Sequence, residues 1–187
     1  GLEVIAEGRK ALEAVASVTG GLSFQFTEFP WGSEFYRETG QLMPDDGIET
    51  LKGFDTILFG AVGDPDIPDH ITLHGLLLPM RRSFDQGVCI RPAYLYPGVE
   101  SPLSGKKAGD IDMVIFRENT EDLYAVGSQG IDVTPDLAID FRVISSPGSR
   151  RIIEAAFAHA RRTGKTRVTV VTKANVVKTT DGKFLDI

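Results

Sequence analysis

Three short apolar runs constrain the fold of this chain more than any other feature. They cover residues 54–62, 111–116 and 167–172, and each ends in glycine or polar residues. The first is the most nearly continuous apolar run and is typical of a strand covered on both faces, as in parallel sheets, and the other two are interpreted as further buried strands. Amphipathic helical patterns alternate with them, at 2–18, 73–84 and 149–162. The alternation predicts an α/β fold with a mixed or parallel sheet flanked by helices.

Weaker patterns complete the predicted element order. Alternation of apolar and polar residues predicts a half-buried strand at 22–26 and a short strand at 88–91. A short helix is expected between Pro44 and Gly53. Residues 126–147 alternate only weakly and are interpreted as an extended arm. In the last helix we expect five residues to face inward, namely Ile152, Ile153, Ala156, Phe157 and Ala160.

Composition excludes several classes of protein. The chain has 187 residues, a length that suits one domain or two small ones. A formal net charge of -6 argues against a nucleic-acid backbone as the main partner. No apolar run approaches the ~20 residues that span a bilayer. The single cysteine, Cys89, excludes an internal disulfide framework. No export signal is visible, and the chain opens with Gly1. We therefore expect a cytoplasmic protein whose sequence starts inside a longer chain.

Three arginines are candidate ligands for an anion. Arg81 falls on a predicted helix, while Arg91 and Arg117 end two predicted strands. A guanidinium offers a planar fork of donors that matches a carboxylate at two points. Each could instead be a surface arginine with a buried stem. The shared position at strand ends favours convergence on one anionic ligand.

Tyr124 and Lys173 are candidates for proton transfer. Tyr124 follows Arg117 by seven residues, and Lys173 directly follows the third apolar run. Either side chain can exchange a proton with a substrate if burial or a nearby charge shifts its pKa toward neutrality. A packing tyrosine and a surface lysine are the plain alternatives.

Other familiar chemistries have little support in the sequence. The histidines, His70, His74 and His159, do not have the spacing of a zinc site. The glycines in 60–63 match no phosphate-binding fingerprint. No serine nucleophile motif is present, and Cys89 has no marked base beside it.

Five ordered segments together resemble the β-decarboxylating hydroxyacid dehydrogenases, the isocitrate/isopropylmalate dehydrogenase family. They are Phe59-Gly60-Ala61-Val62-Gly63, Leu77-x-x-x-Arg81, Arg91-Pro92, Arg117-Glu118-Asn119-Thr120 with Tyr124, and Lys173-Ala174-Asn175. Two further segments are most similar to the tartrate/D-malate branch, namely Pro68-Asp69-His70 and Arg81-Arg82-x-Phe84-Asp85-Gln86. The opening Gly1-Leu2-Glu3-Val4 resembles the end of the family's first glycine-rich segment.

The resemblance implies a two-domain, isopropylmalate-dehydrogenase-like fold that is incomplete at both ends. Residues 1–86 would be part of the large, cofactor-side domain. Residues 87–187 would be part of the small domain, with a dimerisation arm at about 126–147. In this family a lysine and an asparagine reach the site of the partner subunit, so the resemblance implies a homodimer with a shared active site.

The resemblance also implies the chemistry: metal-dependent oxidative decarboxylation of a 2-hydroxy diacid, with hydride transfer to NAD. Mg²⁺ or Mn²⁺ would act as the Lewis acid. Tyr124 would protonate the enolate, and Lys173 would help to remove the hydroxyl proton. The substrate would be bound by Arg81, Arg91, Arg117 and Asn175, and the cofactor by Gly75, Leu76 and Asn175. The metal ligands would follow Ile187, so none is expected in this chain, which alone would be inactive.

Three alternatives stay open. Leu77 and Leu78 could line an alkyl pocket, which would suit 3-isopropylmalate. A non-catalytic regulatory subunit of the same fold would share the architecture but usually lacks the catalytic residues. A plain anion-binding α/β module would not need Lys173 at a strand end. Within the family, Gly75 stands six residues before Arg81, where isocitrate enzymes place a hydroxyl. This glycine counts against isocitrate.

Overall fold

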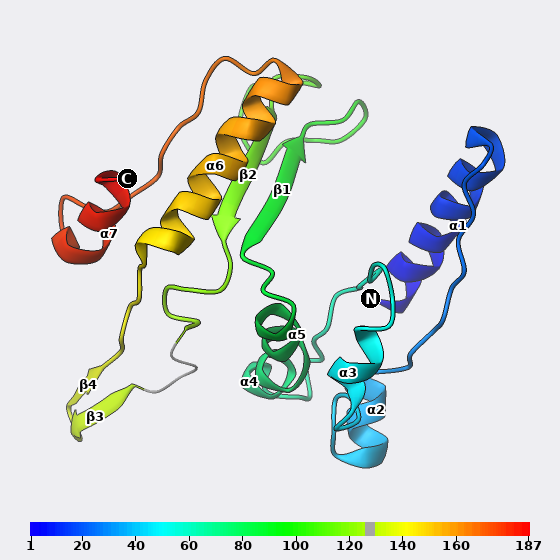
Figure 1. The fold of residues 1–187 in the computed structure, drawn as a ribbon, viewed down its shortest axis with the longest axis horizontal. Coiled ribbons are helices and arrows are strands. Elements are labelled where there is room, and N and C mark those ends of the chain that lie inside the picture. The colour runs from blue at the N-terminus through cyan, green and yellow to red at the C-terminus, as the bar shows by residue number, and fades with distance from the viewer. Residues whose placement is uncertain (126–129) are drawn as a thin grey trace. The chain divides into compact units, whose positions relative to one another are not determined.

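The computed structural model describes residues 1–125 and 130–187 and divides into two compact units (Figure 1). The first unit comprises Gly1–Ser83 and the second Phe84–Ile187. The domain boundary predicted after residue 86 stays a prediction.

The first unit is helical. Its elements are α1 (Leu2–Thr19), α2 (Ser33–Thr39), α3 (Gly47–Leu51), α4 (Asp69–Thr72), the π-helical turn η1 (Leu73–Leu77) and α5 (Leu78–Ser83). Gly20 and Gly21 end α1 because both take positive φ, +68° and +71°, where a side chain is disfavoured. The helices predicted at 2–18, 44–53 and 73–84 are therefore confirmed, whereas α2 was not predicted.

The core of the first unit lies around α3, η1 and α5. Its buried apolar side chains are Leu42, Leu51, Ile67, Leu76, Leu78 and Met80. Gly75 belongs to this packing, because a Cβ there would lie 2.5 Å from Cδ1 of Leu42. By contrast, none of the residues of α1 is buried.

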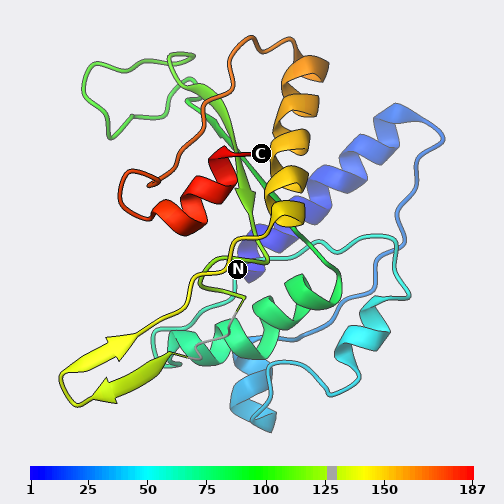
Figure 2. The same ribbon diagram turned by 60° about the vertical axis from the view of Figure 1, so that its left-hand side comes forward.

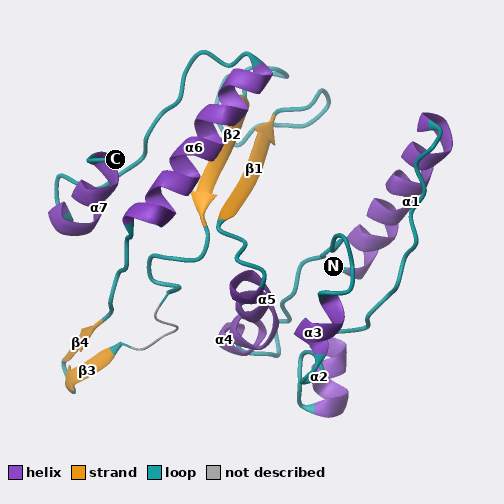
Figure 3. Ribbon diagram, viewed as in Figure 1, coloured by secondary structure: helices purple, strands orange, loops and turns teal. Residues whose placement is uncertain are grey.

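The second unit consists of a helix on a two-stranded sheet, with a separate hairpin. Strands β1 (Val88–Tyr94) and β2 (Asp112–Glu118) pair antiparallel, and α6 (Ser146–Thr163) lies along them (Figures 1 and 2). The ring of Phe116 packs against His159 of α6, with 5.2 Å between centroids. Strands β3 (Ile131–Thr134) and β4 (Leu137–Ile139) form the hairpin, and α7 (Lys178–Leu185) ends the unit (Figure 3).

Three predicted strands are wrong for this structure. Residues 22–26, 54–62 and 167–172 have no strand assignment, and both sheets that form are antiparallel rather than parallel. A strand exists only where a neighbour accepts its backbone hydrogen bonds, and nothing in 1–125 or 130–187 pairs with these segments. Most of their apolar side chains consequently stay exposed to solvent, and Val171 is 90% exposed.

The predicted arm is only partly an extended segment. Its first four residues, 126–129, lie outside the described residues, and 131–139 fold back as the hairpin. All residues of 130–141 are exposed. Pairing of this arm with a partner subunit stays a prediction.

Helix α6 corrects one detail of the predicted inward face. Ile152 and Ala160 are buried, but Phe157 is 50% exposed. The helix rests on a sheet of only two strands, so its apolar stripe is wider than the surface available to cover it. In the described residues, no helix combines the length and the apolar character that a membrane span requires.

Candidate functional site

The ladder between β1 and β2 places Arg91 and Arg117 on the same face of the sheet. Arg117 pairs with Cys89, and Arg91 pairs with Ile115. Directly paired residues share a face, as do residues two apart on one strand. The two arginines are therefore diagonal neighbours, which ordinarily lie about 7–8 Å apart.

The register differs from the prediction that Arg91 and Arg117 both end strands. Arg91 lies in the middle of β1 rather than at its end, while Arg117 is the penultimate residue of β2. Because the strands are antiparallel, their carboxyl ends lie at opposite edges of the sheet. The shared face, not a shared edge, brings the two arginines together.

The face that carries the arginines is open. The side chains that contact α6, Phe116 and Glu118, alternate with Arg117 and so lie on the other face. On the arginine face Ile115 is 50% exposed, Arg91 is exposed and Arg117 is half-buried. An anion can therefore approach both guanidinium groups from solvent.

Tyr124 joins this face through Arg117. The Cζ atom of Arg117 lies 5.0 Å from the centroid of the Tyr124 ring, a cation–π geometry. The contact orients the phenol beside a guanidinium that still has donors for a carboxylate. The structure thus brings together three of the predicted site residues, Arg91, Arg117 and Tyr124.

The turn between Arg117 and Tyr124 is held by the carboxylate of Glu118. It accepts hydrogen bonds from the Thr120 amide at 3.0 Å, the Thr120 hydroxyl at 2.7 Å and the Glu121 amide at 2.7 Å. Arg151 of α6 adds an ion pair at 3.2 Å. Burial acts to raise the pKa of Glu118, but the donors from Thr120, Glu121 and Arg151 outweigh it and the pKa is lowered.

Two further contacts attach the same turn to α6. Arg151 donates to the hydroxyl of Thr120 at 2.9 Å. Arg151 also donates to Asp85, ahead of β1, at 2.8 Å, and this hydrogen bond is the main cause of a raised pKa for Arg151. Glu121 accepts from the backbone amide of Ser145 at 2.8 Å and from its hydroxyl. That hydroxyl in turn accepts from the amide of Gly148 at 3.0 Å and caps α6.

Lys173 and Asn175 lie in the loop that leads into α7. Both side chains are exposed. The backbone of Lys173 is fixed on both sides, because its amide donates to Asp181 at 3.0 Å and its carbonyl accepts from Val176 and Val177 at 2.9 Å. Asp181 is buried, and the amide of Lys173, ahead of Thr172 and Arg142, lowers the pKa of Asp181 below its usual range.

The remaining predicted residues belong to the first unit. Arg81 is half-buried on α5, and Gly75 and Leu76 lie in the π-helical turn η1. The side chain of Leu76 is only 2% exposed, and the position of Gly75 is explained by its contact with Leu42. If Gly75 and Leu76 bind a cofactor, they must do so through their backbone atoms.

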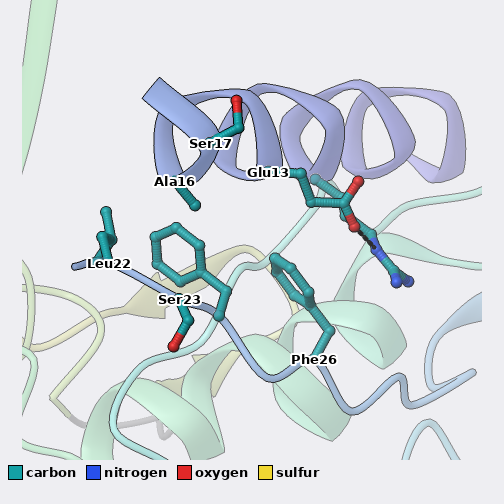
Figure 4. Close-up of a pocket in the computed structure, with 8 residues that line it drawn as sticks. Glu13, Ala16, Ser17, Leu22, Ser23 and Phe26 are labelled. Atoms are coloured by element: carbon teal, nitrogen blue, oxygen red, sulfur yellow. Dashed lines mark hydrogen bonds and ion pairs between the residues drawn. The ribbon is translucent and has the colours of Figure 1, made fainter. Parts of the chain in front are cut away.

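The described residues contain no group of three or more His, Cys, Asp or Glu side chains arranged to hold a metal ion. A shallow groove of about 450 Å³ lies in the first unit between α1 and residues 22–26 (Figure 4). Its charged residues are already engaged, because Arg9 pairs with Glu13 at 2.9 Å and lies over the ring of Phe26. The groove contains none of the predicted site residues.

Sequence reasoning missed the residues that hold the site in place. Those with the clearest contacts are Glu121, Asp122, Arg142, Arg151 and Asp181. Glu118 was recognised only as part of a motif. Asp181 does not cap α7, because its carboxylate accepts from Thr172, Lys173 and Arg142 outside the helix, and no short sequence motif signals these contacts.

Comparison with known proteins gives consistent results. The family model for isocitrate/isopropylmalate dehydrogenase matches residues 1–187. The tartrate dehydrogenase/decarboxylase of Pseudomonas putida is 45% identical over 179 residues, and the decarboxylating D-malate dehydrogenase of Escherichia coli is 44% identical. Each alignment covers 94% of this chain and 49% of the relative. The chain therefore spans about half the length of the curated relatives it matches.

A solved structure agrees with the fold. Isocitrate dehydrogenase from Methylococcus capsulatus superposes with a TM-score of 0.80 at 27% identity, over 100% of this chain and 52% of that chain. The predicted isopropylmalate-dehydrogenase-like fold is thereby confirmed for this chain.

Proposed function

The chain belongs to the isocitrate/isopropylmalate dehydrogenase family, and from that premise we propose that the full-length protein oxidatively decarboxylates a 2-hydroxy diacid of the D-malate or tartrate type. NAD is the proposed hydride acceptor. The observation that carries the proposal is the open sheet face on which Arg91 and Arg117 lie together, with Tyr124 against Arg117.

The proposed roles follow from what these side chains can do. Arg91 and Arg117 each bind a carboxylate oxygen pair through the guanidinium fork. Tyr124 gives a proton to the enolate that is left when carbon dioxide departs. Lys173, exposed at the end of its loop, accepts the proton of the substrate hydroxyl, in the site of a partner subunit of a homodimer.

The family uses a divalent metal as a Lewis acid, but the residues described in this chain do not gather a ligand set for one. The described residues therefore provide no site for Mg²⁺ or Mn²⁺ by themselves. Gly75, Leu76 and Asn175 are the residues of this chain proposed to lie near NAD.

Two features favour D-malate or tartrate over the larger substrates. Leu78, one of the two residues that could line an alkyl pocket, is only 4% exposed because it packs in the core of the first unit. A side chain at position 75 would collide with Leu42, so no hydroxyl for a third carboxylate is available there. A pocket without a partner for that carboxylate disfavours isocitrate.

Steady-state kinetics of the full-length protein test the proposal. Oxidation of D-malate, tartrate, 3-isopropylmalate and isocitrate is followed by reduction of NAD in the presence of Mg²⁺ or Mn²⁺. We expect D-malate to be among the better substrates. A kcat/KM for 3-isopropylmalate about a hundredfold higher than for D-malate, roughly 2.7 kcal/mol of transition-state preference, would refute the substrate assignment.

Two tyrosine substitutions distinguish a loss of the proposed proton transfer from a general loss of folded protein. Tyr124→Phe is expected to lower kcat by about 10²–10⁴-fold, the usual contribution of a positioned acid. Tyr96→Phe is the matched control, because Tyr96 is 63% exposed and packs on Tyr94. Equal kcat values for the two variants would contradict the role of Tyr124.

A further inference from the structure

A buried carboxylate connects the loop of Lys173 to the turn of Tyr124. The side chain of Asp181, on α7, is 7% exposed. Its Oδ1 atom accepts from the hydroxyl of Thr172 and from the amide of Lys173, each at 3.0 Å. The Thr172 hydroxyl also accepts from the amide of Ala174 at 3.2 Å. One carboxylate oxygen thus fixes the backbone immediately before and at Lys173.

The second oxygen of the same carboxylate continues the connection. Oδ2 of Asp181 accepts from Nη1 of Arg142. The Nε atom of Arg142 donates to Oδ1 of Asp122 at 2.6 Å. Arg142 is therefore shared between a buried and a half-exposed carboxylate, whose side chains are 7% and 42% exposed.

Asp122 lies in the turn that precedes Tyr124 and links Arg142 to this turn. Its amide donates to the carbonyl of Val143 at 2.8 Å, and its carbonyl accepts from the amides of Val143 and Ala125 at 3.4 Å. Asp122 takes a positive φ of +64°, a conformation that Asp tolerates better than most residues. Direct contacts therefore run without a break from the amide of Lys173 to the turn before Tyr124.

We propose that Asp181 and Arg142 are positioning residues that hold the loop of Lys173 and the turn of Tyr124 at a fixed separation. The inference rests on the proposed function, because it assumes that Lys173 and Tyr124 transfer protons.

The geometry explains why both residues are needed. A neutral group at position 181 keeps an acceptor for the amide of Lys173 but loses the ion pair with Arg142. A lysine at position 142 keeps the charge but presents one ammonium group where the guanidinium reaches two carboxylates. With either change, the distance between the loop of Lys173 and the turn of Tyr124 is less firmly fixed, while both proton-transfer groups remain.

The test uses Asp181→Asn, Arg142→Gln and Arg142→Lys in the full-length protein. We expect Asp181→Asn and Arg142→Gln to lower kcat about tenfold to a hundredfold, as small misplacements of reacting groups do. KM for the diacid should stay within roughly threefold, because no substrate ligand is removed. Arg142→Lys should retain more activity than Arg142→Gln.

A matched control and a structural readout complete the design. Asp112→Asn removes the ion pair with Lys165, at 2.9 Å, elsewhere in the second unit and should leave kcat unchanged. Hydrogen exchange of the peptide that contains Lys173 should be faster in Asp181→Asn than in the control. For every variant, kcat is normalised to the fraction of folded protein measured by circular dichroism.

The outcomes separate this inference from the proposed function. Unchanged kcat in Asp181→Asn, with active wild-type enzyme, overturns the positioning role and leaves the proposed function standing. A loss of kcat that disappears on normalisation to folded protein also overturns it. Wild-type protein that oxidises none of the diacids overturns both.

Discussion

Replacement of Glu118 by alanine should destabilise the second unit more than loss of any exposed ion pair. The Glu118 side chain is 17% exposed, and its carboxylate receives four donors from Thr120, Glu121 and Arg151. Removing it leaves two backbone amides and a hydroxyl without their acceptor in a half-buried turn. Arg151 keeps its hydrogen bond to Asp85.

The size of the effect follows from the number of donors. A hydrogen bond to a charged group contributes about 1.5–3 kcal/mol, but bonds that share one acceptor are not additive. We therefore expect Glu118→Ala to cost about 2–4 kcal/mol in the free energy of unfolding. Glu118→Gln keeps one acceptor oxygen and should cost about 1–2 kcal/mol.

The pH dependence has a definite sign. The pKa of Glu118 is lower in the folded protein than its ordinary value of about 4.3. The stabilisation is therefore complete above that value and is lost as the pH falls through the folded pKa. The difference in stability between wild type and Glu118→Gln should be constant from about pH 6 to 8 and should shrink below about pH 4.

Urea denaturation of the full-length protein, followed by far-ultraviolet circular dichroism at neutral and acidic pH, measures these differences. Asp112→Asn is the control, because an exposed ion pair is worth about 1 kcal/mol or less. A cost for Glu118→Ala no larger than that of the control would refute the reasoning. So would a wild-type advantage over Glu118→Gln that does not change with pH.

Three further predictions concern the anion site, the arm and a helix cap. Arg117→Lys should raise KM for the diacid about tenfold to a hundredfold, since an ammonium cannot bind a carboxylate through two parallel hydrogen bonds; an unchanged KM would count against Arg117 as a ligand. Val133→Asp, in the exposed hairpin, should shift the full-length protein from dimer toward monomer in sedimentation, and a wild-type protein that is already monomeric would exclude the arm from dimerisation. Ser145→Ala should cost about 1 kcal/mol of stability through the lost cap of α6, and no change in urea denaturation would contradict that role.

The helices were predictable because their signals are local. Gly20 and Gly21 end α1, and the apolar spacing of 149–162 located α6 to within a few residues. The strands at 54–62 and 167–172 were not correctly predicted. An apolar segment indicates that a strand could be buried there, but the strand forms only if neighbouring strands are present to pair with it. In a chain that spans about half the length of its relatives, those runs remain unpaired among the described residues.

The candidate site was predictable in its residue types but not in its geometry. Placement along the sequence and the resemblance both pointed to Arg91, Arg117 and Tyr124, but the two arginines meet on a shared face of the sheet and not at a shared strand end. Register depends on which residue pairs with which across the sheet, and one residue of slippage would move Arg91 to the other face. The residues that hold the site, such as Asp181, act through backbone contacts that no short motif records.

In the segment Arg117-Glu118-Asn119-Thr120, a residue of the anion site is followed directly by residues that hold the turn in place. Neighbours on a strand face opposite sides of a sheet, so Arg117 lies on the open face while Glu118 points toward α6 and pairs with Arg151. Asn119 then ties the end of β2 to the start of β1, because its amide donates to Gly87 and its side chain to Gln86, each at 3.2 Å. A change at any of these positions therefore acts on the anion site either directly or through the turn that brings Tyr124 to Arg117. Kinetic and stability measurements on the same variants distinguish a direct effect on the anion site from an effect through the turn. Arg117→Lys should change KM with little loss of stability. Glu118→Gln should lower the free energy of unfolding at neutral pH and should change KM only if the turn becomes disordered.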